Sequence, residues 1–444
     1  MKFEIQDGVL LKCRLNAGET EVVIPEGVTS IGKEAFTECR GLQSISIPES
    51  VTSIGEKAFF RCSSLQSINI PESVTEIGAE AFYWCSSLQS ITIPESIRSI
   101  AHGLFCGCER LQHIHLPEQL ESIENRAFGG CCIESITIPK RIQRIENSTF
   151  ISCRYLQSII FPENVAKIGY AAFYECRSLE SITIPETVRS IEYGAFAYCE
   201  KLHSISVAPN HLYFTADDDV LFDKKQERLI MYPCGKQETH YRIPDSVRKI
   251  GIMAFYYCNK LQSVTIPESV TSIGADAFAC CSSLQSITIP DSVMHIGKDA
   301  FDYCRSLQSI VFRGFVIPTD QYDPNRLHKD MPKLNDMLRT EDYAKDIPAV
   351  LKIPVLLTEY RKHLSPKLAD WIRDNALEVL NFLIECDDAA AAASVLQIGN
   401  LSLPSQEIEK AFALAVMHTQ NGGNPEIQML LMRYLKEHFP QEEQ

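Results

Sequence analysis

One pattern of 23 residues governs most of this sequence. It runs from Ile266 to Thr288, and the same frame begins again at Ile289. Earlier copies begin at Ile24, Ile47, Ile70, Ile93, Leu116, Ile138, Phe161, Ile184 and Ile243. These are about eleven copies, nearly all in register. A fixed period of this length is typical of a solenoid, in which each unit forms one coil that stacks on the next.

Each unit divides into segments of different chemistry. The segment Leu42–Ile47 alternates between apolar and hydroxyl residues at its end, which predicts a strand with the isoleucines inward. Pro48 ends that strand, and Val51–Ile54 predicts a second short extended piece. Gly55 marks a turn. The spacing of Ala, Phe and Cys in Glu56–Cys62 predicts a single helical turn that carries the phenylalanine into the interior.

The chain has 17 cysteines, and most of them recur at one repeat position. These are Cys39, Cys62, Cys85, Cys108, Cys131, Cys153, Cys176, Cys199, Cys258, Cys281 and Cys304. Stacked coils would bring their backbones to about 4.8 Å, near the lower end of disulfide spacing. The side chains would run parallel, however, which favours a column of buried thiols and a reducing compartment over a disulfide framework.

The repeated frame reads L-x-x-I-x-I-P-x-x-V-x-x-I-G-x-x-A-F-x-x-C, as in Leu65–Cys85 and Leu88–Cys108. This signature resembles the BspA-like leucine-rich repeat family over residues 3–313. The resemblance implies an α/β solenoid, a right-handed leucine-rich-repeat coil with a parallel sheet. It also implies protein binding or adhesion more often than catalysis. Two departures stand out: Ala101 and Glu192 replace the turn glycine, and the unit from Leu116 is one residue short.

The period also sets the expected domain boundaries. Residues 1–23 predict an N-terminal cap hairpin around Asp7-Gly8, and residues 24–313 predict the solenoid. The period breaks at 207–242, which predicts a hairpin insert; its three adjacent aspartates, Asp217–Asp219, fit a solvated turn better than a calcium loop. Residues 314–333 contain three prolines and predict a polar linker. Residues 334–444 predict an all-α domain, either weakly ankyrin-like or a compact bundle.

Charge and motifs narrow the functional classes. The net charge is -15, which argues against nucleic-acid partners and anionic membrane surfaces. We expect no membrane insertion, because no run of eighteen apolar residues occurs. The first residues contain no apolar run of signal-peptide length, so we expect a cytoplasmic protein, or a secreted or cell-surface one if a signal peptide was removed. Phosphate-binding, zinc-protease and nucleophile-elbow motifs are absent, so we expect neither an enzyme nor a cofactor.

Candidate binding residues are the exceptions to the repeat. The outward strand positions are almost all Ser or Thr, as in ice-binding solenoids, but hydroxyls also simply suit a soluble sheet. This surface changes character at His113, His115, Ile160 and Val311. On the helical turn, Trp84 beside Tyr83 is the best anchor candidate, since Trp and Tyr are enriched at binding hot spots. We interpret these six residues as possible protein-binding positions.

One group of residues has the composition of a metal site. It comprises His102, Cys106, Cys108, His113 and His115. The two strand histidines should share an exposed surface, whereas Cys108 belongs to the inward column, so solvent-facing histidines are the better interpretation.

The predicted function is a non-catalytic protein-protein interaction scaffold that uses the solenoid surface and the helical C-terminal domain. The alternative is a bacterial cell-surface adhesin that binds a host matrix protein or glycan. A third hypothesis is an enzyme with an unrecognised site in the helical domain.

Overall fold

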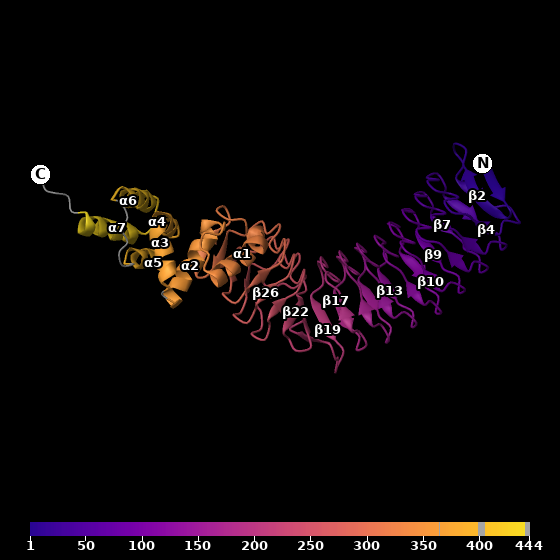
Figure 1. The fold of residues 1–444 in the computed structure, drawn as a ribbon. Coiled ribbons are helices and arrows are strands. Elements are labelled where there is room, and N and C mark those ends of the chain that lie inside the picture. The colour runs from indigo at the N-terminus through magenta and orange to yellow at the C-terminus, as the bar shows by residue number, and fades with distance from the viewer. Residues whose placement is uncertain (364, 398–404, 440–444) are drawn as a thin grey trace.

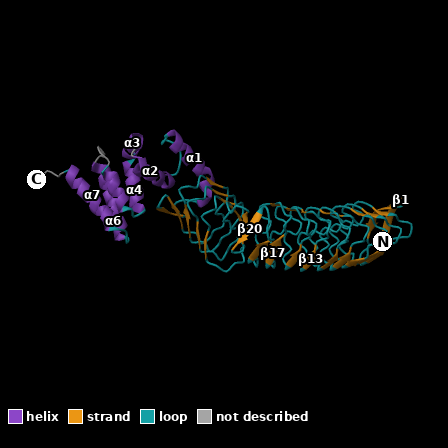
Figure 2. Ribbon diagram, turned by 90° about the horizontal axis from the view of Figure 1, so that it is seen from below, coloured by secondary structure: helices purple, strands orange, loops and turns teal. Residues whose placement is uncertain are grey.

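The computed structural model describes residues 1–363, 365–397 and 405–439. Stacked coils form a long arch, with the N-terminus at one end and a group of helices at the other (Figure 1). Seen from below, the strands of many coils follow one side of the arch, and the helices lie beyond its end (Figure 2). The predicted solenoid with a helical C-terminal region is confirmed.

An antiparallel hairpin covers the N-terminal end of the solenoid. It consists of β1 (Lys2–Gln6) and β2 (Val9–Arg14). The turn residues Asp7 and Gly8 both have positive φ, 50° and 80°, as two-residue hairpin turns require. Strand β2 pairs in parallel with β4 (Ser30–Ile31), so the hairpin continues the stacking direction of the coils.

Each coil contributes two short strands to the stack. The first series, which carries the outward hydroxyl rows, is β3 (Glu21–Val23), β5 (Ser44–Ser46), β7 (Ser67–Ile68), β9 (Ser90–Thr92), β11 (His113–His115), β13 (Ser135–Thr137), β15 (Ser158–Ile160), β17 (Ser181–Ile184), β19 (Ser204–Val207), β23 (His240–Arg242), β25 (Ser263–Thr265), β27 (Ser286–Ile289) and β29 (Ser309–Phe312). The second series is β4, β6 (Ser53–Ile54), β8 (Glu76–Ile77), β10 (Ser99–Ile100), β12 (Ser122–Ile123), β14 (Arg144–Ile145), β16 (Lys167–Ile168), β18 (Ser190–Ile191), β24 (Lys249–Ile250), β26 (Ser272–Ile273) and β28 (His295–Ile296). Equivalent residues pair, as Ile45 does with Ile68.

The segment between the second strand of a coil and its repeat cysteine, which we call the turn edge, differs from the predicted helical turn. In Gly55–Cys62, Lys57 and Arg61 have φ of 56° and 57°, and most other coils repeat this pair. Alternate amides reach the next coil: the N–H of Phe59 donates to the carbonyl of Ala81 at 2.8 Å. In a helical turn, all backbone amides would point along the helix axis and none would reach the next coil. The observed alternating conformation is favoured because its amides form hydrogen bonds to the neighbouring coil.

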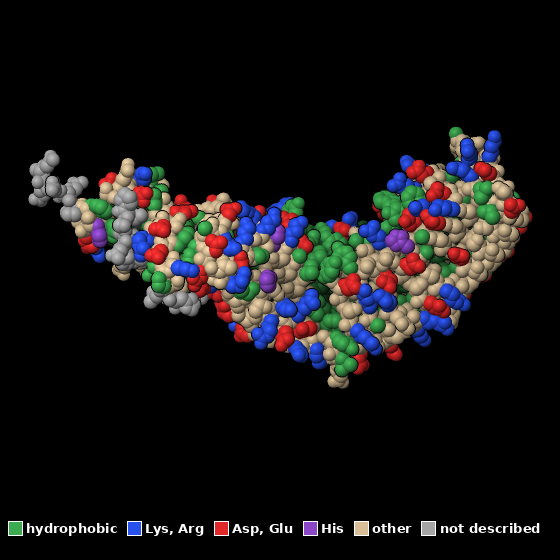
Figure 3. Space-filling view, viewed as in Figure 1, with side chains coloured by type: hydrophobic (Ala, Val, Ile, Leu, Met, Phe, Trp, Pro, Cys, Tyr) green, Lys and Arg blue, Asp and Glu red, His purple; other side chains and the backbone are tan. Residues whose placement is uncertain are grey.

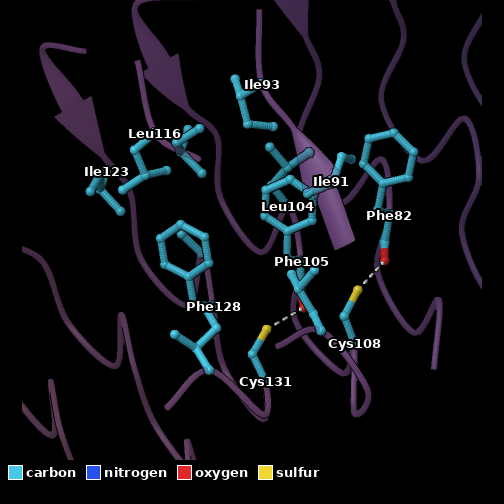
Figure 4. Close-up of a cluster of buried hydrophobic side chains, with 14 of the residues drawn as sticks. Phe82, Ile91, Ile93, Leu104, Phe105, Cys108, Leu116, Ile123, Phe128 and Cys131 are labelled. Atoms are coloured by element: carbon cyan, nitrogen blue, oxygen red, sulfur yellow. Dashed lines mark hydrogen bonds between the residues drawn. The ribbon is translucent and has the colours of Figure 1, made fainter. Parts of the chain in front are cut away.

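Identical side chains form columns through the interior. The phenylalanine of each turn edge stacks on its copies, with centroid distances such as 5.3 Å between Phe59 and Phe82 and 5.8 Å between Phe105 and Phe128. The rings lie near isoleucines and leucines contributed by the strands and turns (Figure 4). Tyr232, within the segment 207–242, occupies the phenylalanine position, and its ring centroid lies 5.3 Å from that of Phe255.

The predicted column of free thiols is present beside the rings. All 17 cysteines are free, and the repeat cysteines of the interior coils are buried. Nine of the repeat thiols donate a hydrogen bond to the carbonyl oxygen of a phenylalanine 25 or 26 residues earlier, as Cys131 does to Phe105 at 3.2 Å (Figure 4). Burial raises the pKa of the Cys153 thiol to about 12. The thiols therefore serve as neutral donors inside the core.

The break in the period is filled by three antiparallel strands. They are β20 (Phe214–Asp217), β21 (Val220–Asp223) and β22 (Arg228–Met231), and β22 rejoins the parallel stack beside β24. Asp218 and Asp219 form the tight turn, both with positive φ. The carboxylate of Asp218 lies 3.0 Å from the ammonium group of Lys236.

The segment 314–333, expected to be a polar linker, is folded against the solenoid. It contains β30 (Phe315–Pro318), antiparallel to β29, and a 3-10 turn, η1 (Pro324–Arg326). The helices that follow are α1 (Leu327–Thr340), α2 (Ala349–His363), α3 (Pro366–Asp374), α4 (Ala376–Glu385), α5 (Ala389–Leu396), α6 (Ser405–Gln420) and α7 (Pro425–His438). None of the described helices is long and apolar enough to cross a membrane.

The helices share one hydrophobic core with the last coils. A single cluster of buried side chains runs from Val220 to Tyr434. Arg313, whose side chain is 11% exposed, bridges Asp291 of the solenoid at 3.4 Å and Glu359 of α2 at 3.2 Å. The side-chain amide of Asn335 in α1 donates to the carbonyl of Met294. The helical region is therefore joined to the coils by packing and charge.

Candidate functional site

The coil formed by residues 116–137, the short coil, interrupts the stack. Its 22-residue length comes from the connection Cys131-Cys132-Ile133, which has one residue fewer than Cys108–Leu111. In this described part of the chain, β11 and β13 belong to separate sheets, and so do β12 and β14. Outside the insert, this is where both strand series stop between the same pair of coils. A missing residue shortens the path back to the strand, and strand pairing stops there, whereas the turn edge stays linked: the N–H of Gly107 donates to the carbonyl of Gly129 at 2.7 Å.

Three surface hollows border this coil. One of about 780 Å³ lies along the second strands, between Glu121–Asn125 and Lys140–Glu146. Another of about 500 Å³ lies between β9–β11 and Glu134-Ser135. The third, of about 610 Å³, lies on the turn edge and is called the Trp84 slot. Its lining residues are Tyr83, Trp84, Cys106, Gly107, Glu109, Arg126, Gly129, Gly130, Cys131, Cys132, Ile151, Ser152, Arg154 and Tyr155.

Glycines form the floor of the Trp84 slot. Gly107 and Gly130 have positive φ, at a position where other coils place side chains such as Arg61 or Tyr257. A Cβ added to Gly107 would lie 3.0 Å from atoms of the Trp84 ring, so the indole lies directly over this glycine. A Cβ on Gly129 would lie 3.0 Å from Ile151. The missing side chains open a recess between the indole and the coils that follow.

Aromatic and basic side chains form the walls of the slot. Trp84 is 45% exposed and Tyr155 is 57% exposed. Arg154 pairs with Glu175 at 3.0 Å, whereas no ion pair of the Arg126 guanidinium occurs within the described ranges. Tryptophan, tyrosine and arginine are the residue types that most often dominate binding energy at protein interfaces. The slot therefore combines two exposed rings with the guanidinium group of Arg126, and Glu109 is the acidic residue of its lining.

Three cysteines line the slot: Cys131 belongs to the buried thiol column, whereas Cys106 and Cys132 are partly exposed. Burial raises the pKa of the Cys106 thiol, and burial raises the pKa of the Cys132 thiol. The Cys132 thiol donates a hydrogen bond to the carbonyl of Glu109. Both groups are neutral at physiological pH, so they offer soft contact surface and weak donors more than nucleophiles.

The other candidate residues lie apart from the slot. His113 and His115 are exposed on one face of β11, where His115 lies 3.3 Å from Glu95, and both line the hollow beside β13. Ile160 is 63% exposed on β15, opposite Thr137. Val311 is half-buried in the C-terminal hairpin and pairs with Val316. The sequence candidates therefore do not form one site.

The metal-like group of cysteines and histidines is dispersed. Cys108 is buried and donates to the carbonyl of Phe82 (Figure 4), whereas the β11 histidines face outward. Among the described residues, no cluster of three potential metal ligands occurs.

Tyrosines along the same turn edge contact one another. The Tyr174 and Tyr256 hydroxyls are 3.1 Å apart across the insert, and the rings of Tyr198 and Tyr257 are 3.8 Å apart. Figure 3 shows hydrophobic side chains gathered over the middle of the arch, between stretches of mixed charge. The tyrosine contacts join the coils on either side of the insert, which is a structural role.

Sequence reasoning named Trp84 but missed the glycines that expose it. Gly129 and Gly130 read as isolated turn signals. Aligning the copies would have shown that two successive coils lack a side chain beside a tryptophan, next to the one unit that lacks a residue.

Comparisons with known proteins agree with the architecture. The sequence matches the family described as BspA type Leucine rich repeat region, in six copies over residues 5–133, 121–217 and 232–322. A leucine rich cell surface protein from Faecalibacterium prausnitzii is 28% identical, with a TM-score of 0.51 over 69% of this chain and 86% of that one. A leucine-rich repeat protein from Bacteroides ovatus is also 28% identical, with a TM-score of 0.41 over 70% and 85% of the two chains.

Among curated proteins, none matches this sequence. The family match covers more than half of the chain, and the solenoid, its columns and its parallel sheets account for the repeated signature. The chain belongs to the BspA-type leucine-rich repeat family.

Proposed function

We propose that this protein is a non-catalytic interaction scaffold that holds a protein partner at the Trp84 slot. The observation that carries the proposal is the coincidence of the short coil, the glycine floor and two exposed aromatic walls. The outward strand faces, by contrast, carry mostly small hydroxyl residues, which offer little area for anchoring a partner. A recess with aromatic and arginine walls matches the anatomy of an interface hot spot.

Turn-edge variants with a matched control test this proposal. Trp84→Ala removes one wall, and Tyr155→Ala removes the other. Tyr303→Ala is the control, because Tyr303 occupies the repeat position of Trp84, has φ of 53° and is 64% exposed. The measurement is quantitative crosslinking capture from the native cell with each full-length variant. We expect partners that wild type and Tyr303→Ala retain but that both slot variants lose. Equal capture by all four proteins would contradict recognition at the slot.

A second candidate is adhesion at the cell surface, and the similarity to the Faecalibacterium prausnitzii cell surface protein favours it. In that case the partner is a matrix protein or a glycan outside the cell. Labelling intact native cells with a membrane-impermeant biotin reagent separates the two candidates. Biotin on this protein would support adhesion, whereas biotin only on known surface proteins would support the intracellular scaffold.

A further inference from the structure

A surface groove lies close to the junction of the solenoid with the helical region. It has a volume of about 700 Å³ and lies between α2 and α4, and Gln321 also lines it. Phe382 of α4 lies 6.0 Å from Phe315 of β30, so the solenoid fixes the position of α4. The groove therefore lies close to the junction of the solenoid and the helical region, where packing against the solenoid holds α4 in place.

The floor of the groove is apolar. Ala349, Val350 and Ile353 come from α2, and Leu377 and Phe382 come from α4. The side chains of Val350 and Leu377 are only partly buried, so apolar area remains open to solvent. An apolar trough between two helices is the geometry into which amphipathic helices dock.

The rim of the groove carries hydrogen-bond acceptors, two of them with negative charge. Glu378 and Glu385 are exposed, line the groove, and lie seven residues apart on α4, which places them two turns apart, about 10.5 Å, on one face. Within the described part of the chain, neither carboxylate has an ion-pair partner. Between them, the side-chain oxygen of Asn381 is shielded from solvent and accepts no hydrogen bond from the described residues.

Among the described residues that line the groove, none is a cation that could pair with these acceptors. Lys352 of α2 is near enough to feel the charge of Glu378 but forms no ion pair with it among the described residues. Its ammonium group lies 5.0 Å from the centroid of the Trp371 ring and donates to the carbonyl of Lys345. Two carboxylates and a desolvated amide oxygen above an apolar floor are complementary to apolar side chains flanked by cations.

We propose that this groove binds an amphipathic helical segment of a partner protein, with apolar residues on the floor and two basic residues seven positions apart. The spacing of Glu378 and Glu385 sets that periodicity, because a helix lying along α4 repeats its side-chain directions over two turns. Asn381 accepts a hydrogen bond from a donor on the same face of the bound helix. This site is independent of the Trp84 slot and remains even where the slot binds nothing.

The test uses the full-length protein and a pair of synthetic peptides. The probe is a fluorescein-labelled leucine-rich amphipathic peptide with two lysines seven positions apart, and its twin carries glutamates at those positions. Fluorescence anisotropy measures the affinity of each. We expect the lysine peptide to bind and the glutamate peptide to bind at least about 10-fold more weakly.

Charge reversal separates a specific groove from general attraction to an acidic protein. The variant Glu378→Lys/Glu385→Lys is expected to lose about 10-fold in affinity for the lysine peptide and to gain affinity for its twin. The control Glu409→Lys/Glu437→Lys makes the same charge change at exposed positions of α6 and α7 and should stay within about 2-fold of wild type.

Two results would overturn the proposal. One is an equal loss of affinity in both double variants, which would mean non-specific charge attraction. The other is undiminished binding of a lysine peptide whose centre carries a helix-breaking proline, which would show that the occupant is not helical. Circular dichroism of each variant excludes unfolding as the cause of lost binding.

Discussion

The solenoid and the helical region pack their cores in opposite ways. In the solenoid, Phe59 lies between Phe36 and Phe82, and the same stacking continues to Phe196 and resumes from Tyr232 to Phe301. In the helical region, Phe382 meets Phe315 and the contacts are between unlike residues. Packing against copies makes the period visible in the sequence and makes each coil depend on two neighbours. Packing between unlike residues leaves no such trace and confines a defect to its own site.

The largest effect should come from alkaline titration of the thiol column. Burial raises the pKa of Cys153 and of Cys234 from the ordinary 9.0 to about 12. The folded state thus keeps protons that the unfolded chain releases. This contribution to stability is complete below pH 9 and is lost as the pH rises toward 12. We expect cooperative loss of circular dichroism in that window, together with thiolate absorbance.

Thiol labelling at neutral pH provides the control for that titration. The partly exposed Cys106, Cys132 and Cys280 should react before the buried repeat cysteines. Gradual thiolate formation near pH 9 in a protein that keeps its structure would show that the column is open to solvent.

Truncating a column ring should cost more than truncating a ring in the helical region. Phe105→Ala removes a fully buried side chain that stacks on two neighbours, and we expect a loss of about 3–5 kcal/mol in the free energy of unfolding. Phe382→Ala loses one aromatic contact and should lie at the lower end of that range. Urea denaturation measures both, and hydrogen exchange should report loosening in three adjacent coils only for Phe105→Ala. Exchange confined to one coil would remove the proposed dependence between neighbours.

A substitution at the junction of the solenoid and the helical region should have an intermediate effect on the free energy of unfolding. Arg313→Ala breaks bridges to Asp291 and Glu359, which are themselves partly exposed, and should cost about 2 kcal/mol. Arg248→Ala, at a residue that is 63% exposed, should cost less than about 1 kcal/mol. Limited proteolysis should leave 314–333 intact in wild type and expose it in Arg313→Ala. Cleavage there in wild type would mean that the two regions are only tethered.

The smallest effect should be on the stability of the slot variants. Trp84 is half-exposed and adopts a positive φ that favours no bulky residue, so Trp84→Ala should change the free energy of unfolding by less than about 1 kcal/mol. Thermal denaturation of Trp84→Ala and Tyr303→Ala should give similar midpoints. A large drop for Trp84→Ala alone would mean that the indole over Gly107 stabilises the stack more than it serves binding.

Much of the solenoid was predictable because its core residues recur at one position. The stacked coils, the thiol column and the Asp7-Gly8 hairpin follow from spacing and turn chemistry alone. The conformation of the turn edge was not predictable, because the spacing of Ala58, Phe59 and Cys62 also fits a helix. The hydrogen bonds from backbone amides to the next coil determine this conformation, and the sequence of a single unit does not indicate them. Prolines at 318, 324 and 332 suggested a linker, whereas the long-range packing of Phe315 and Leu327 orders it.

The candidate site was only partly predictable. Trp84, His113 and Ile160 were named as interruptions of a pattern, but the hollows depend on neighbouring coils: strand pairing stops beside the short coil, and glycines leave the Trp84 slot open. Whether a tryptophan is exposed for binding or only covers the core depends on the residues at the same position of the neighbouring coils, which here are Gly107 and Gly130.

The amides that reach from one turn edge to the next lie along the length of the arch. A pulling force applied to the two ends would load these hydrogen bonds along their own direction and separate coils singly from an end. Each regular coil released would add 23 residues, about 80 Å of extended chain, the short coil one residue less, and the stretch with the insert more. The protein would then lengthen in nearly equal steps, giving way gradually under tension that a compact domain would resist until it failed at once.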